Sequence, residues 1–188
     1  MISFIIIRND FFLLVLLFMK KNKNQLIIAC FFGIIISIGV GFLSSLVSRD
    51  AIPNWYKYLN KPFFSPPNWI FSPVWTLLYT LMGIAVGRVW FYGKKHELGK
   101  KALYYFIAQL IFNGLWSLVF FGLNSPFIAL LVILILWILI LRTIYWFRFI
   151  DRNASFMLYP YLAWVSFATI LNIGCLLYTS PSPRDVLR

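Results

Sequence analysis

Residues 127–141 read Phe-Ile-Ala-Leu-Leu-Val-Ile-Leu-Ile-Leu-Trp-Ile-Leu-Ile-Leu, an unbroken apolar run inside the longer segment 126–147. A helix needs about 20 predominantly apolar residues to cross the hydrocarbon layer of a membrane. Segment 126–147 reaches that length, because Pro126 can open the helix and apolar residues continue to Phe147. The run therefore predicts a transmembrane helix.

Working outward from this run, four more segments are long and apolar enough to span a membrane. They are residues 25–47, 71–92, 102–123 and 153–178. Membrane-spanning barrel strands alternate polar and apolar residues over about 10 positions, and these runs are longer and continuous. The sequence therefore predicts an all-α membrane protein built as a bundle of five transmembrane helices.

The composition agrees with a membrane protein and excludes a soluble enzyme. Of 188 residues, 62% are hydrophobic and 12% are charged, whereas soluble domains have about 45–50% apolar and about 25% charged residues. The net charge of +12 comes from cations that flank the apolar runs. We therefore expect the lipid bilayer, and not a nucleic acid, to be the partner of these charges.

The two ends of the chain differ in composition from the part between them. Residues 11–19 are apolar but too short to span, so we expect residues 1–19 to be an extension before a native start at Met19. Residues 179–188 are polar and contain two prolines, which is typical of a disordered tail, and we expect this tail to be non-native. The predicted membrane domain is residues 20–178.

The lysines and arginines outside the spans are distributed unequally between the two sides of the membrane. One side has nine of them and the other has five: Lys20, Lys21, Lys23, Lys94, Lys95, Lys100, Lys101, Arg148 and Arg152 against Arg49, Lys57, Lys61, Arg184 and Arg188. By the positive-inside rule, this difference places the N-terminus in the cytoplasm and the C-terminus outside.

Local signals mark where several helices begin. Ser72-Pro73 and Ser125-Pro126 each combine a capping oxygen with a proline suited to a first helical turn. Asn153 is a possible cap for the fifth span, and Pro160 is expected to kink that span.

The first span has small residues at intervals of four. Ala29, Gly33, Ser37, Gly41 and Ser45 form one stripe, which allows close approach of another helix. Two interpretations stay open: a seam between two copies of the chain, or packing within one bundle.

Polar side chains inside the spans are few and share faces with aromatic residues. Gln109 and Asn113 are followed on the same face by Trp116, and Asn172 shares a face with Trp164 in the fifth span. Amides facing lipid would lack partners, so they should point into the bundle. They either join helices around a solid core or line a pocket for a flat aromatic ligand.

The loop of residues 49–68 has four prolines and several aromatic residues. Since aromatic side chains at this density avoid water, we expect the loop to fold over one end of the bundle as a lid. An aromatic belt at the membrane surface is the alternative.

The spans lack the groups that most enzymes use. All five carboxylates lie in loops, tails or span ends, and the one histidine, His96, lies in a basic loop. No catalytic set, metal cluster or phosphate-binding loop can be assembled. We therefore predict no catalytic or metal-binding residue and no required cofactor.

Three stretches together resemble the TspO/translocator protein family, also called tryptophan-rich sensory proteins. The first covers residues 53–83 and includes Pro-Pro-Asn-Trp-Ile-Phe-Ser-Pro-Val-Trp at 66–75. The second includes Gln109, Asn113 and Trp116, and the third is Pro-Tyr-Leu-Ala-Trp at 160–164 followed by Leu171-Asn172. The resemblance covers residues 20–177.

This resemblance implies a five-helix bundle, usually a homodimer, that binds porphyrins and other hydrophobic ligands in a central cavity. It implies that the cavity is lined by Trp75, Asn113, Trp116, Trp164, Ala168 and Leu171, with Phe71, Ser72, Val74 and Tyr79 nearby. We place the lid and mouth at Arg49, Trp55, Tyr56, Lys57 and Lys61.

The expected function is that of a receptor or sensor for tetrapyrroles in a bacterial inner membrane. A transporter of such ligands, a catalyst of light-dependent porphyrin degradation and an interaction scaffold are the alternatives.

Overall fold

The computed structural model describes residues 2–59 and 62–179, and the side chains of residues 23–59 and 62–177. Two sequence predictions lie outside the described residues. They are Lys61 as a residue of the cavity mouth and residues 180–188 as a disordered tail. The elements in chain order are α1 (Ile2–Asn54), η1 (Tyr56–Tyr58), η2 (Asn68–Ile70), α2 (Phe71–Gly93), α3 (Glu97–Ser117), η3 (Leu118–Gly122), α4 (Pro126–Arg148), α5 (Arg152–Phe156) and α6 (Tyr159–Thr179).

The prediction of an all-α chain with five membrane-spanning helices is confirmed. The described residues contain helices and no strand, and five helical segments are long and apolar enough to cross a membrane. These segments are Lys23–Asn54, Asn68–Gly93, Glu97–Gly122, Pro126–Arg148 and Arg152–Leu177. The first helix is longer than the span expected at 25–47, because residues 2–24 continue α1 and it ends only after Pro53.

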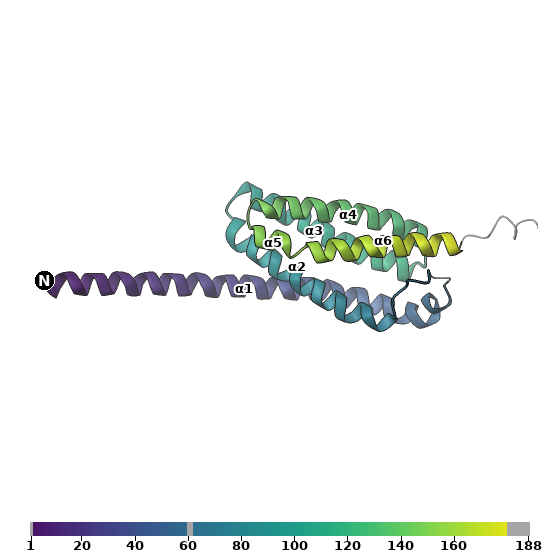
Figure 1. Ribbon diagram of the computed structural model, residues 1–188, viewed down its shortest axis with the longest axis horizontal. Helices are drawn as coiled ribbons and strands as arrows, with labels where there is room; N and C mark the ends of the chain where they lie inside the picture. The colour runs from purple at the N-terminus through teal and green to yellow at the C-terminus, as the bar shows by residue number, and fades with distance from the viewer. Residues whose placement is uncertain (1, 60–61, 180–188) are drawn as a thin grey trace, which may run out of the picture.

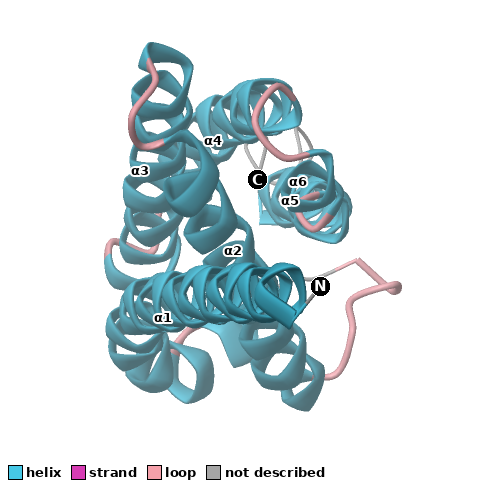
Figure 2. Ribbon diagram, turned by 90° about the vertical axis from the view of Figure 1, so that its left-hand side faces the viewer, coloured by secondary structure: helices cyan, strands magenta, loops and turns pink. Residues whose placement is uncertain are grey.

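The helices form a bundle with two distinct ends (Figure 1). We call one the loop end, where residues 55–70 lie, and the other the lysine end, which holds the α2–α3 turn at residues 94–96. The N-terminal part of α1 projects beyond the lysine end (Figure 1). In the end-on view α1 lies at the edge of the bundle beside α2 (Figure 2). The chain's other main contacts are α3 with α4 and α4 with α6.

The stripe of small residues in α1 packs against α2 of the same chain. A methyl group added at Gly33 would overlap the carbonyl of Gly83, and one added at Gly87 would overlap the backbone of Cys30. Ser37, one turn beyond Gly33 along the stripe, is fully buried. Van der Waals contact must hold membrane helices together, since lipid supplies no hydrophobic driving force between them. The Gly33–Ser37 part of this stripe therefore packs within one bundle, and the expected homodimer stays a prediction.

The amides predicted to point into the bundle do so. Gln109, Asn113 and Asn172 are 1%, 2% and 1% exposed. Asn172 donates a hydrogen bond of 2.8 Å to the backbone oxygen of Pro126 and so ties α6 to the first residue of α4. Asn172 therefore joins two helices, which is the first of the two roles considered for these amides.

Helix ends differ from the sequence signals at the second, fourth and fifth spans. Ser72 does not cap α2, because the helix begins at Phe71 with Ile70 at the cap position, so Ser72 and Pro73 lie in its first turn. The fifth span is broken rather than kinked, because α5 ends at Phe156 and Pro160 lies in the first turn of α6, where its missing N–H costs little. Asp151, and not Asn153, caps α5, since its side chain accepts from the backbone N–H of Asn153. Ser125 lies at the cap position of α4 as expected but makes no side-chain cap bond.

A partly buried ion pair, which the sequence analysis did not anticipate, joins α2 to the turn before α5. Arg88 Nε donates to Asp151 Oδ2, and the two side chains are 22% and 8% exposed. The guanidinium also lies 5.7 Å from the ring centre of Tyr92. An arginine inside a membrane-spanning helix is thereby neutralised at the lysine end of the bundle.

Candidate functional site

A cavity of about 610 Å³ opens between α1, α2 and α3 in the half of the bundle near the loop end. This volume lies within the range of about 300–1,000 Å³ that is usual for small-molecule sites. Most of its wall is apolar and aromatic. The lining residues are Ile38, Gly41, Phe42, Ser44, Ser45, Ser48, Arg49, Ile52, Tyr56, Asn68, Phe71, Ser72, Trp75, Thr76, Tyr79, Asn113, Trp116, Ser117 and Phe121.

The structure brings many of the predicted site residues together on this wall. They come from all three helices and from the residues that follow α1. They are Phe71, Ser72, Trp75, Tyr79, Asn113 and Trp116, together with Arg49 and Tyr56 from the predicted lid and mouth. The cavity wall therefore includes the aromatic faces of α2 and α3 that the helical spacing of the sequence predicts.

Other predicted site residues lie off this wall. Val74, Trp164 and Ala168 pack against the hydrophobic core, and Leu171 is 8% exposed. Trp164 lies behind the wall, with its ring centre 6.0 Å from that of Phe71. The side of the cavity that we expected from α6 is made by α1, whose serines the sequence analysis did not place in the site. The only signal for them was the small-residue stripe, which ends at Ser45.

Both indoles of the wall are stacked on a neighbouring aromatic ring. Trp75 stacks on Tyr79 with ring centres 5.4 Å apart and an angle of 28° between their planes. Trp116 stacks on Phe120 at 5.3 Å and 23°. Such pairs hold one another's rotamers, and a rigid aromatic wall suits a flat apolar ligand.

Asn113 connects three helices at the base of the cavity. Tyr79 Oη in α2 donates to Asn113 Oδ1 in α3, and Asn113 Nδ2 donates over 3.0 Å to Tyr161 Oη in α6. All three side chains are buried. Asn113 thus orients one wall tyrosine and is 2% exposed, so most of its amide is engaged with the protein.

Replacing Asn113 by leucine is expected to lower the free energy of unfolding by about 2 kcal/mol, because it leaves two buried hydroxyls without this partner. Tyr161→Phe removes only one bond and should cost about 1 kcal/mol. Denaturant unfolding in detergent micelles measures both. Thr169→Val is the matched control, since that hydroxyl bonds only within α6, to Val165. Equal stability of Asn113→Leu and the control would contradict the network.

The residues after α1 fold onto the loop end of the bundle. Tyr56 is 7% exposed and its ring lies 6.2 Å from Phe120 and 5.8 Å from Phe121. Burial raises the pKa of Tyr56 to about 12, so its phenol is neutral at physiological pH. Pro62 contacts Gly174 of α6 so closely that a methyl group there would overlap its ring. The loop is thus held at two points.

Other aromatic residues of the same loop are open to the surroundings. Phe63 is 98% exposed and Trp69 is 72% exposed. Side chains of this kind at a bundle end suit the interface between membrane and water. The loop therefore combines features of both interpretations, a covering segment and an aromatic belt.

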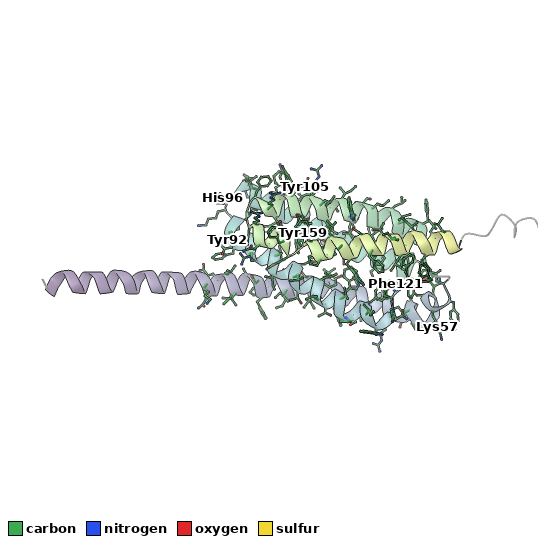
Figure 3. All side chains as sticks on the ribbon, in the orientation of Figure 1. Lys57, Tyr92, His96, Tyr105, Phe121 and Tyr159 are labelled. Atoms are coloured by element: carbon green, nitrogen blue, oxygen red, sulfur yellow. The ribbon has the colours of Figure 1, made fainter. Side chains whose placement is uncertain are left out.

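Charged groups of the predicted mouth lie at the loop end. Arg49 is exposed and lines the cavity, whereas Lys57 lies off it, with its ammonium 5.8 Å from the ring of Tyr58. Figure 3 shows Lys57 and Phe121 at this end, opposite His96 and Tyr92 at the lysine end. Arg49 is thus the charged side chain on the described cavity wall.

A five-helix membrane bundle with an aromatic cavity and a covering loop is the class of protein that this fold and site define. The family model for the TspO/MBR family matches residues 32–177. The chain belongs to the TspO/MBR family.

Named relatives come from all three domains of life. "Tryptophan-rich protein TspO" of Archaeoglobus fulgidus is 40% identical, covering 76% of this chain and 91% of the relative. "Tryptophan-rich protein TspO" of Chlorobaculum tepidum is 39% identical over 82% and 97%. "Translocator protein" of Bos taurus is 35% identical over 75% and 83%. The chain is therefore an integral, multi-pass membrane protein of a family of sensory and translocator proteins.

Proposed function

We propose that the protein is a membrane receptor or sensor that binds porphyrins and similar flat hydrophobic ligands in the cavity between α1, α2 and α3. The observation that carries the proposal is an aromatic cavity of about 610 Å³ with Arg49 as its charged side chain. A porphyrin has a flat apolar ring and carboxylates at its edge, and both parts have a counterpart here.

The ring would lie against the indoles of Trp75 and Trp116, whose rotamers are held by Tyr79 and Phe120. The carboxylates would face Arg49, which is exposed and can form a charge-assisted pair with them. The serine hydroxyls of α1, such as that of Ser48, already bond to the helix backbone and offer further acceptors.

Movement of the loop would widen the entry to the cavity. Tyr56 lines the cavity and rests on Phe120 and Phe121, so moving it opens the loop end. Loop opening of this kind is a usual gate for a ligand site. Binding that displaces the loop would also give a sensor a signal to pass on.

We further propose that the lysine end faces the cytoplasm of a bacterial inner membrane. The excess of lysine and arginine at that end supports this orientation through the positive-inside rule. The cavity would then lie in the half of the bundle nearer the outer surface.

Trp75→Ala and Trp116→Ala are each expected to weaken porphyrin binding about fivefold or more, because an aromatic pair contributes about 0.5–1.5 kcal/mol beyond its buried area. Quenching of tryptophan and porphyrin fluorescence in detergent micelles measures the affinity. Trp137→Ala is the control, since this indole in α4 bonds to Ser166 and lies off the cavity wall.

A second arm separates ring binding from carboxylate binding. Arg49→Gln should weaken binding of the free-acid porphyrin and leave binding of its neutral ester unchanged. Wild-type affinity in both tryptophan variants, with the folded proteins recovered, would refute this cavity as the porphyrin site.

A further inference from the structure

A second cavity of about 680 Å³ lies between the same three helices, in the half of the bundle near the lysine end. It is lined by the N-terminal part of the first span, the C-terminal part of α2 and the middle of α3. The lining residues are Gln25, Ile28, Ala29, Phe32, Gly33, Ile36, Val86, Gly87, Trp90, Phe91, Lys94, Leu103, Phe106, Ile107 and Leu110. We call it the lysine-end groove.

The groove shares no lining residue with the porphyrin cavity. Between them, α1 and α2 come into backbone contact at Gly33 and Gly83, and Ser37 is fully buried. A ligand in one site would therefore not fill the other.

Its polarity is graded along the bundle. Gln25 and Lys94 are the polar side chains on the described wall. Gln25 lies near the start of the first span, and Lys94 follows α2 directly. Trp90, one turn before Lys94, is 51% exposed, as is common for indoles at the membrane surface. The rest of the wall, from Ile28 to Leu110, is apolar.

The charge near the groove is unbalanced. Glu97 is the acidic residue of the neighbouring turn, and Lys100 pairs with it at 2.7 Å. Lys101 is engaged too, with its ammonium 4.7 Å from the ring of Trp146. Among the described residues, no carboxylate lies within ion-pair distance of Lys94. An anion at the mouth of the groove would find this ammonium available.

We propose that the lysine-end groove binds one anionic phospholipid from the leaflet at that end, with an acyl chain along the apolar wall and the headgroup phosphate on Lys94. An apolar slot that ends in a free cation at the surface matches an amphiphile with a long tail and a negative head. A zwitterionic lipid would fill the slot but leave Lys94 without a net negative partner.

The test uses the full chain in detergent micelles, with phosphatidylglycerol and phosphatidylcholine of identical acyl chains as probes. Native mass spectrometry counts the retained lipids. The wild-type protein should retain one phosphatidylglycerol in preference to phosphatidylcholine. Lys94→Gln should reduce that retention about fivefold, the effect of removing one lysine at an anionic surface. Lys95→Gln, next to it and off the groove wall, should change it little.

A second pair of variants tests the apolar part. Ile107→Trp fills the groove and should reduce retention of both lipids, whereas Ile111→Trp, one turn further on α3 and off the groove wall, should not. Both positions are more than half exposed, so both variants are expected to fold. Equal effects within either pair of variants would overturn the proposal. So would a dimer that excludes lipid and dissociates in Ile107→Trp, because a second copy would then cover the groove.

Discussion

Replacing Gly83 by alanine is expected to separate α1 from α2 and to destabilise the protein by about 2 kcal/mol or more, since overpacking costs about 1–3 kcal/mol at a site that can relax. The added methyl group would overlap the backbone of Ile34, which cannot rotate away as a side chain can. The helices must move apart, and contacts along the whole stripe are weakened. Denaturant unfolding in micelles should show the loss.

Gly39→Ala is the matched control, because this glycine lies in α1 and a methyl group there meets nothing within 4 Å. Alanine is the better helix former by about 1 kcal/mol, so the control should be neutral or stabilising. If Gly83→Ala were as stable as Gly39→Ala, the close approach of α1 to α2 would be refuted.

Replacing Asp151 by asparagine is expected to lower the free energy of unfolding by about 3 kcal/mol. This is the low end of the ~3–5 kcal/mol cost of breaking a buried ion pair, because Arg88 is partly exposed. Asparagine keeps a side-chain oxygen for the backbone N–H of Asn153, so the cap of α5 is preserved. The loss therefore reports on the unpaired arginine.

The double variant Arg88→Gln with Asp151→Asn separates charge from contact. With both charges removed, no buried ion is left unpaired, and most of the stability should return. A thermodynamic cycle from unfolding in micelles gives the coupling between the two residues. Additive losses from the two single changes would show that the pair contributes no coupling.

The number and position of the spans could be predicted because the hydrocarbon layer sets a length and excludes charge. Segment 126–147, for example, differs by one residue from α4, which ends at Arg148. Helix breaks were harder to predict. Pro160 was expected inside a helix, yet the short α5, capped by Asp151, places it at the start of α6.

The cavity wall could be predicted only in part. Helical spacing shows which residues of one helix share a face, as with Trp75 and Tyr79, but does not show which helix that face meets. The aromatic face of α6 around Trp164 meets Phe71 and the core, while α1 closes the cavity. The ligand itself stays a prediction, based on the resemblance and on the aromatic wall.

The ion pair of Arg88 was not predicted, because the positive-inside rule uses only the charges in loops and Arg88 lies inside α2. Its signal was visible as a single cation within an apolar span of α2, together with Asp151 at the end of another span. In a membrane helix an unpaired charge is costly enough to require a partner. Pairing each such charge with a carboxylate at similar depth would have predicted this contact.

The π-helical turn η3 at the end of α3 makes the position of the loop depend on the number of residues in that turn. Leu123 N–H bonds to the oxygen of Leu118, five positions earlier, so one more residue is accommodated than in a regular α-helical turn. That extra residue brings both Phe120 and Phe121 against Tyr56. A homologue with a different loop sequence can therefore keep the same contact surface for the loop at Phe120 and Phe121. An insertion or deletion of one residue in η3 would instead rotate these two rings away from Tyr56.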